Sequence, residues 1–261
     1  MQPEKKTIFD FQFISAPGIA EVVANVFEVI NDPGAKQIDF LITPNAYQLV
    51  HFNDPDNLVL KQFYRESTFI LPDGMPVIWM SKLLNRKLTT RLTGSDLFPA
   101  LWNEIKKRQL PVMLILPGKE LEELFKKDYP ASASLVPGIF QQGDENYINT
   151  FCENVTEKIL LTKPSFVFLG LGFPKQEILG MHISAMLREK GYDGKILFLL
   201  LGASFEFYFR LKKRAPAFWQ NTGLEWLYRF AKEPRRLWKR YTIDNLRFLA
   251  LALREMKKGR T

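Results

Sequence analysis

Three runs of apolar residues constrain the fold of this chain more than any other feature. They read QIDFLIT at residues 37–43, SFVFLGL at 165–171 and KILFLLL at 195–201. Continuous apolar runs of this length are typical of strands that are buried on both faces. A longer stretch with helical character, residues 175–190, separates the last two runs. The alternation predicts an α/β fold in which helices cover both faces of a mainly parallel sheet.

The rest of the chain up to residue 216 fits the same pattern. Either Ser95 or Asp96 is expected to cap a helix that runs through residue 107, because both side chains accept backbone hydrogen bonds at a helix start. We expect further strands at residues 67–71, 111–116 and 132–136, and further helices at 55–65, 75–84, 119–127 and 146–161. Ligands of such sheets bind at the carboxyl ends of the strands, which directs attention to residues 43–45, 72–74, 170–177 and 202–206.

The positive charge lies in the last fifth of the chain. Residues 205–261 contain 15 Lys and Arg against 5 Asp and Glu, whereas residues 1–204 contain 21 against 23. No strand is convincing beyond residue 216, and helices are expected at 224–231 and 235–258, separated by Pro234. We therefore divide the chain into an α/β body, residues 1–216, and a basic helical appendage, residues 217–261. One apolar stripe is expected on the last helix, formed by Leu246, Leu249, Ala250, Leu253 and Met256.

Three interpretations of the appendage remain open at this point. Basic charge interleaved with large apolar residues suits a surface that meets anionic lipid head groups. It also suits a phosphate-rich ligand. In the third interpretation, the helix simply docks on the body and its basic face is solvated.

The residue inventory argues against several classes of protein. A single cysteine, Cys152, excludes an intrachain disulfide. Two histidines, His51 and His182, and one cysteine do not make a zinc cluster, so no metal is expected. Asp54 and Asp56 have the Asp-x-Asp spacing of some metal-dependent sugar transferases, but their turn-like surroundings favour helix capping. No apolar run approaches the roughly 18 residues of a membrane-spanning helix, and we expect no signal peptide at the N-terminus.

Asp73 is the best candidate for a general base. It follows an expected strand and precedes Gly74, which allows a substrate to approach the backbone closely. Its apolar surroundings would raise its pKa toward neutrality, as a base needs. An aspartate in a turn beside a glycine also occurs without any function, and the residues alone leave both interpretations open.

The string at residues 170–177 (GLGFPKQE) is the second candidate site. It follows a strand and precedes a helix, as in dinucleotide-binding folds, but Lys175 stands in place of the third glycine of that fingerprint. Lys175 and Gln176 are expected where side chains and backbone N–H groups of a helix start can meet an anion or a nucleotide. The alternative is an ordinary helix start with solvated polar residues.

Taken together and in this order, several strings resemble the WecG/TagA/CpsF family of bacterial glycosyltransferases. The resemblance spans roughly residues 35–241, and its strings are TPN at 43–45, DGMP at 73–76, RLTGSDL at 91–97, GLGFPKQE at 170–177, KRAP at 213–216, GLEWLYR at 223–229 and EPRR at 233–236.

The resemblance implies a Rossmann-like α/β body with a C-terminal helical appendage. It implies a hexosyltransferase, of the UDP-N-acetylmannosamine type or a related one, that needs no cofactor and no metal. The reaction implied is inverting transfer of a sugar from a UDP-sugar to a polyprenyl-diphosphate-linked sugar, in the synthesis of a bacterial cell-surface polysaccharide or teichoic acid. The enzyme is then expected to be cytoplasmic and peripheral on the inner face of the cell membrane. A homo-oligomer is left open.

The resemblance also implies roles for single residues. Asp73 is the base, and Thr43 and Asn45 lie near the donor sugar and the reaction centre. The remaining residues are expected to bind substrate, with the three appendage arginines reaching toward the diphosphate or the membrane: Arg91, Gln176, Glu177, Arg229, Arg236 and Arg240.

This chemistry agrees with the residue inventory. Inverting transfer needs one base and no second carboxylate. Without a metal, the charge that develops on the diphosphate has to be met by cations and N–H groups, which arginines supply. Two alternatives from other classes are a dinucleotide-dependent oxidoreductase, which would need a fuller glycine fingerprint, and a nucleic-acid-binding module, against which the acidic body argues.

Overall fold

The computed structural model describes residues 3–141, 143–216, 218–219 and 222–258. Its centre is a six-stranded sheet with the order β4-β3-β8-β7-β5-β6, and every neighbouring pair is parallel. The α/β fold expected from the sequence is therefore confirmed. The strands are β3 (Ile38–Ile42), β4 (Phe69–Ile70), β5 (Val112–Ile115), β6 (Ala133–Leu135), β7 (Phe166–Leu169) and β8 (Ile196–Leu200).

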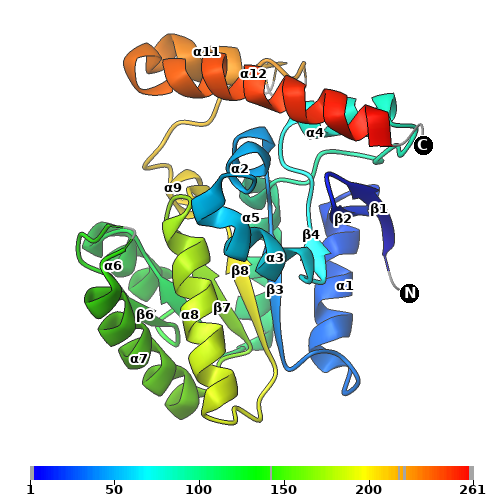
Figure 1. The fold of residues 1–261 in the computed structure, drawn as a ribbon. Helices are drawn as coiled ribbons and strands as arrows, with labels where there is room; N and C mark the ends of the chain where they lie inside the picture. Colours follow the sequence, from blue (N-terminus) through cyan, green and yellow to red (C-terminus); the bar gives the residue numbers. More distant parts are fainter. Residues whose placement is uncertain (1–2, 142, 217, 220–221, 259–261) are drawn as a thin grey trace.

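Helices cover both faces of the sheet, and each face has its own apolar core (Figure 1). Successive side chains of β7 illustrate this, since Val167 belongs to one core and Phe168 to the other. One face is covered by α2 (Ala46–His51), α3 (Leu58–Arg65), α7 (Glu145–Thr162) and α8 (Lys175–Glu189). The other is covered by α1 (Ile19–Asn31), α5 (Gly94–Arg108), α6 (Lys119–Asp128) and α9 (Ser204–Tyr208).

Several local features differ from the sequence-based expectations. An antiparallel hairpin of β1 (Glu4–Ile8) and β2 (Phe11–Ser15) precedes α1, and neither the hairpin nor α1 was expected. Neither Ser95 nor Asp96 caps α5. The helix begins at Gly94, and the cap is Thr93, whose hydroxyl accepts a hydrogen bond from the Asp96 N–H at 3.1 Å.

The expected capping role of Asp54 is also wrong. Asp54 precedes a short 3₁₀ turn (Pro55–Asn57), but its carboxylate makes no cap hydrogen bond. It is bonded instead to His51 Nδ1 at 2.6 Å and to Arg247 of the appendage. The cause is partly tertiary, because Arg247, which is distant in sequence, and the neighbouring His51 compete for the carboxylate.

The appendage forms a layer above one end of the body. It contains α11 (Glu225–Lys232) and α12 (Pro234–Lys258), and α12 passes over α2 and α4 (Met75–Leu83) in Figure 1. The contact face of α12 includes Phe248, whose ring meets that of Phe9 edge-on with centroids 5.4 Å apart. No helix within the described part of the chain is both long and apolar enough to cross a bilayer.

The expected apolar stripe on the last helix is not its docked face. Leu246, Leu249 and Leu253 are 68%, 58% and 59% exposed. The buried positions of α12 include two acids, which have basic partners on the body. Asp244 lies 3.3 Å from His51 Nε2, and Glu255 lies 3.3 Å from Arg86. The helix therefore turns these two acids toward the body and leaves the three leucines largely exposed.

Candidate active site

Two cavities of about 520 Å³ each meet at the carboxyl ends of β3 and β4. The first, the polar cavity, lies among the loops after the strands and is lined by Thr43, Ser95, Gln176, Gly202 and Ser204 among others. The second, the apolar groove, lies between α4 and α12. Six residues line both and so mark the junction: Asn45, Tyr47, Asp73, Ser95, Arg229 and Arg240.

Asp73 stands at this junction. The backbone fixes it, since its N–H donates to the Pro44 carbonyl at 3.3 Å, and Gly74 then turns the chain into α4 with a φ of +97°. Positive φ at this point favours glycine. Burial raises the pKa of the Asp73 carboxyl to about 6, and the nearby Arg91 opposes that rise. Within the described residues, no group donates a hydrogen bond to this carboxylate, so it remains available to accept a proton.

Thr43 and Asn45 follow β3 and also line the polar cavity. The Asn45 side chain caps α2 by accepting the N–H groups of Tyr47 at 3.0 Å and Gln48 at 3.3 Å. Gln48 completes the cap, because its side-chain oxygen accepts the Asn45 N–H at 3.2 Å. Asn45 is thus held in place by its own hydrogen bonds, and the buried Thr43 lies two residues before it in the chain.

Gln176 and Glu177 have different positions although they are adjacent in α8. Gln176 lines the polar cavity, and its side-chain oxygen accepts the N–H of Gly202 at 3.0 Å. Glu177 is 2% exposed and lines neither cavity. One of its carboxylate oxygens accepts hydrogen bonds from Gln176 at 3.0 Å and Gln48 at 3.2 Å, while the other has no partner among the described residues. Burial raises the pKa of Glu177 to about 7, opposed by these two amides.

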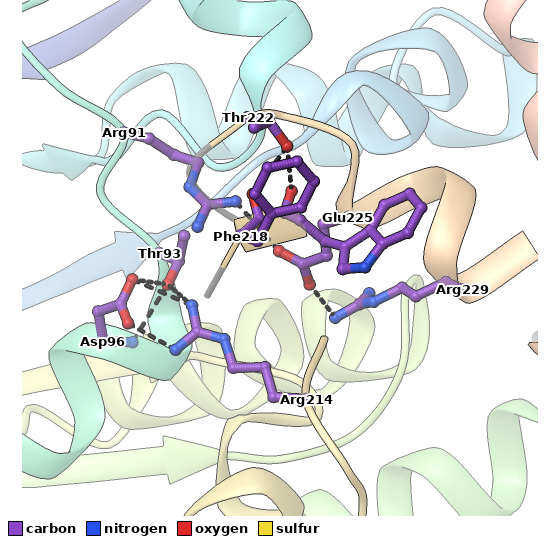
Figure 2. A network of polar contacts seen from close by, with 9 residues as sticks. Arg91, Thr93, Asp96, Arg214, Phe218, Thr222, Glu225 and Arg229 are labelled. Atoms are coloured by element: carbon purple, nitrogen blue, oxygen red, sulfur yellow. Dashed lines mark hydrogen bonds and ion pairs between the residues drawn. The ribbon is translucent and has the colours of Figure 1, made fainter. Parts of the chain in front are cut away.

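Arginines of the body and of the appendage converge on Glu225, at the start of α11 (Figure 2). The Glu225 carboxylate pairs with Arg91 of the body at 3.1 Å and with Arg229 of α11 at 2.8 Å. Beside this pair, Arg214 is bonded through both terminal nitrogens to Asp96, at 2.6 and 3.1 Å. This arrangement sets cationic groups along the edge of the junction.

Arg240 of α12 reaches the same junction from the other side. Its guanidinium lies over the Tyr47 ring, 4.7 Å from the centroid, and 3.5 Å from the Asn45 side-chain oxygen. Burial lowers the pKa of Arg240. Arg236 lies on α12, but its side chain is outside the described residues. Lys175, expected near an anion, lies over the Phe140 ring at 4.7 Å and lines neither cavity.

The structure adds residues that the sequence did not single out as site residues. Arg214 and Glu225 line the apolar groove, and Tyr47 and Ser95 line both cavities. Arg214 and Glu225 lie in the strings KRAP and GLEWLYR, so the signal was present in the sequence. The pairing of Glu225 with Arg91 could not be predicted from these strings.

The described residues contain no group of three or more His, Cys, Asp or Glu side chains arranged to hold a metal ion. The junction combines a carboxylate of raised pKa with several guanidinium groups. Such a set can take a proton from a hydroxyl and stabilise negative charge that develops nearby.

Known proteins of one family are similar to this chain. Residues 7–261 match the model of the glycosyl transferase WecG/TagA/CpsF family. A protein of Bacillus spizizenii named N-acetylglucosaminyldiphosphoundecaprenol N-acetyl-beta-D-mannosaminyltransferase is 31% identical over 206 residues, which cover 77% of this chain and 74% of that protein. A protein of the same name from Staphylococcus aureus strain MRSA252 is 27% identical over 222 residues, covering 85% of this chain and 83% of its own.

Proposed function

This chain belongs to the WecG/TagA/CpsF family and is a hexosyltransferase, and from that premise we propose that it moves N-acetylmannosamine, or a related sugar, from a UDP-sugar to N-acetylglucosamine carried on a polyprenyl diphosphate. The observation that carries the proposal is the position of Asp73, at the junction of a polar cavity and an apolar groove. A polar nucleotide-sugar suits the first and a lipid-linked acceptor suits the second. We propose neither of the two alternative classes, the oxidoreductase and the nucleic-acid-binding module, for this chain.

In the proposed reaction, the Asp73 carboxylate takes the proton of the acceptor sugar hydroxyl. The oxygen of that hydroxyl forms a bond to the anomeric carbon of the donor, and the bond from that carbon to UDP breaks on the opposite face. The configuration at the anomeric carbon is thereby inverted. A carboxyl of pKa about 6 is mostly ionised at neutral pH and still basic enough to accept the proton.

The departing UDP carries the negative charge that develops in this step. Arg229 and Arg240 line both cavities, so they are placed to meet that charge without a metal ion. Thr43, Asn45 and Gln176 line the polar cavity and are assigned to the donor. Arg91 is assigned to acceptor binding from its place in the apolar groove, and Arg236 to the diphosphate or to lipid. Glu177 is reassigned from substrate binding to holding Gln176 and Gln48 in place.

The appendage, residues 217–261, is proposed to place the body, residues 1–216, against the inner face of the cell membrane. Trp238, Ile243 and Leu246 on α12 are 53%, 41% and 68% exposed, and Arg247 and Arg254 are exposed on the same helix. Apolar side chains beside basic ones suit an anionic lipid surface. Such a location fits an enzyme of cell-surface polysaccharide or teichoic acid synthesis.

The experiment is an assay of purified protein with a panel of UDP-sugars and a water-soluble N-acetylglucosamine diphosphate carrying a short lipid tail. We expect transfer from UDP-N-acetylmannosamine or a close relative, undiminished by EDTA. NMR of the product should show an anomeric configuration opposite to that of the donor. Absence of transfer from every donor would refute the proposal, retention would refute the single displacement, and a loss with EDTA that Mg²⁺ restores would refute metal independence.

A further inference from the structure

The apolar groove between α4 and α12 continues well beyond the groups that do the chemistry. From α4 it is lined by Met75, Trp79 and Leu83, and from α12 by Leu249, Leu253 and Met256, among others. Trp79 and Leu83 are 47% and 59% exposed, so a large apolar surface faces the groove without a covering element in the described part of the chain. Exposed apolar surface of this extent usually marks a binding site.

The appendage contacts α4 and the residues after it at both ends of the groove. On the appendage side, Gly223 has a φ of +77°, and a Cβ at this position would lie 2.8 Å from Met75 Cγ and 3.1 Å from the Trp79 ring. The backbone before α11 therefore lies directly against α4. At the far end, Glu255 of α12 pairs with Arg86, which follows α4, at 3.3 Å. The first contact positions the start of the appendage against α4, and the second positions the end of α12 beside the segment that follows α4.

The groove is also long enough for an extended chain. Its lining residues on α12 run from Arg240 to Met256, which corresponds to about 24 Å of helix. Its inner end is the junction with Asp73, Arg229 and Arg240, and its outer end lies at Met256 near the end of α12. A ligand that fits this order carries a reacting hydroxyl, then an anionic link, then a long apolar tail.

We propose that the groove binds the first several isoprene units of the polyprenyl-diphosphate acceptor, an inference that rests on the proposed function. The acceptor sugar then lies at Asp73, and its diphosphate lies at the inner end of the groove near Arg91, which lines the groove and not the polar cavity. A prenyl chain is favoured over a peptide because the groove leads to the base and its outer lining on α12, Leu249, Ala252, Leu253 and Met256, is apolar. It is distinct from a general membrane contact, because Trp238 and Leu246 lie on the same helix outside the groove.

The test compares acceptors that differ only in tail length. Two N-acetylglucosamine diphosphates, one with a single isoprene unit and one with four, are assayed in detergent-free buffer below their aggregation concentrations. The measured quantity is the ratio of kcat/KM for the long acceptor to that for the short one. We expect wild-type enzyme to prefer the long tail at least tenfold.

The matched pair of variants is L253Q and L246Q. Both leucines are exposed on α12, at 59% and 68%, but only Leu253 lines the groove. L253Q should lose most of the preference for the long tail, and L246Q should keep the wild-type ratio. Trp79→Ser, on the opposite wall, should act like L253Q and provides a second variant if L253Q does not fold. Calorimetry gives a readout without catalysis, because a three-isoprene diphosphate should bind wild-type enzyme more tightly than inorganic diphosphate does.

The possible results of the tail-length assay separate the groove from the proposed function. Equal ratios in wild type, L253Q and L246Q, or no tail preference in wild type, would overturn the groove while leaving the proposed function standing. Equal losses in L253Q and L246Q would mean that the tail contacts the general apolar surface of α12, which also overturns it. If wild-type enzyme transfers sugar to neither acceptor, the proposed function itself fails.

Discussion

The body and the appendage differ in how much apolar surface they bury. In the body, the strands are buried on both faces, and aromatic side chains such as Phe98 and Trp102 are fully buried against one another. In the appendage, no residue of α11 is buried and its Glu225 pairs with Arg91 of the body at 3.1 Å, whereas α12 buries only a few apolar side chains against the body, among them Phe248 and Ala252. Hydrophobic burial contributes about 25 cal/mol per Å² of apolar surface, whereas partly exposed ion pairs contribute little and are screened by salt.

This difference matters because the candidate site needs both parts. Asp73, Thr43 and Gln176 come from the body, while Arg229 and Arg240 come from the appendage. The contrast assigns proton transfer to the body and charge stabilisation to the appendage. Substitutions on either side of the junction test this division.

The largest effect is expected for Asp73→Asn. The amide cannot accept the proton, so turnover should fall by roughly two to four orders of magnitude. In wild-type enzyme, kcat/KM should fall as the pH drops through about 6, because protonation removes the base. UDP affinity and the midpoint of thermal unfolding serve as controls and should stay near those of wild type. Near-normal turnover of the variant would remove Asp73 from the mechanism.

The next largest effect is expected on kcat for Arg240→Ala in the appendage, and Arg254→Ala is the control. Loss of one positioned cation at a developing charge should reduce kcat by about 10²-fold or more. Arg254 is exposed on the same helix and lines neither cavity, so its substitution should leave kcat unchanged.

Steady-state kinetics with the short-tailed acceptor separates this role from membrane attachment. Equal activities of the two variants would mean that the appendage places the enzyme at the membrane but does not stabilise the developing charge. The division between body and appendage would then have to be redrawn.

The sequence predicted the body better than the appendage for a physical reason. Continuous apolar runs specify strands that are buried on both faces, and β3, β7 and β8 lie where the runs lie. The rule that ligands bind at strand ends then brings together Thr43, Asp73 and Gln176, and all three line the polar cavity. These inferences use local pattern and fold topology only.

Features set by tertiary contacts could not be predicted in the same way. Glu225 pairs with Arg91 across 134 positions of sequence, and no local pattern indicates that partner. The Gln176–Glu177 pair is a second case, because adjacent helix residues differ in direction by about 100°, and packing decides which one faces the cavity. The hairpin of β1 and β2 is a third, since its burial depends partly on Phe248 from the far end of the chain.

The smallest effect is expected for Glu177→Gln, which tests how a buried carboxyl affects the stability of the body. Glutamine keeps an oxygen to accept the amides of Gln176 and Gln48, but it cannot ionise. The native pKa of about 7 lies above the ordinary 4.5, so wild-type protein binds more protons folded than unfolded between these values. Its stability therefore falls as the pH rises from about 4.5 to about 7, and the variant escapes that loss.

We expect the free energy of unfolding of E177Q, relative to wild type, to rise between pH 5 and pH 8 by at most about 3 kcal/mol. The slope with pH is the measured quantity, because an unpaired amide N–H in the variant adds a cost that does not depend on pH. Glu122→Gln gives the opposite case, since the hydrogen bond from Ser134 holds the pKa of Glu122 below its usual value. Wild-type protein should therefore gain stability over E122Q as the pH rises from the acid range. Denaturant titrations at several pH values measure both slopes, and a flat difference for E177Q would mean that its carboxyl is ionised in the folded body at every pH tested.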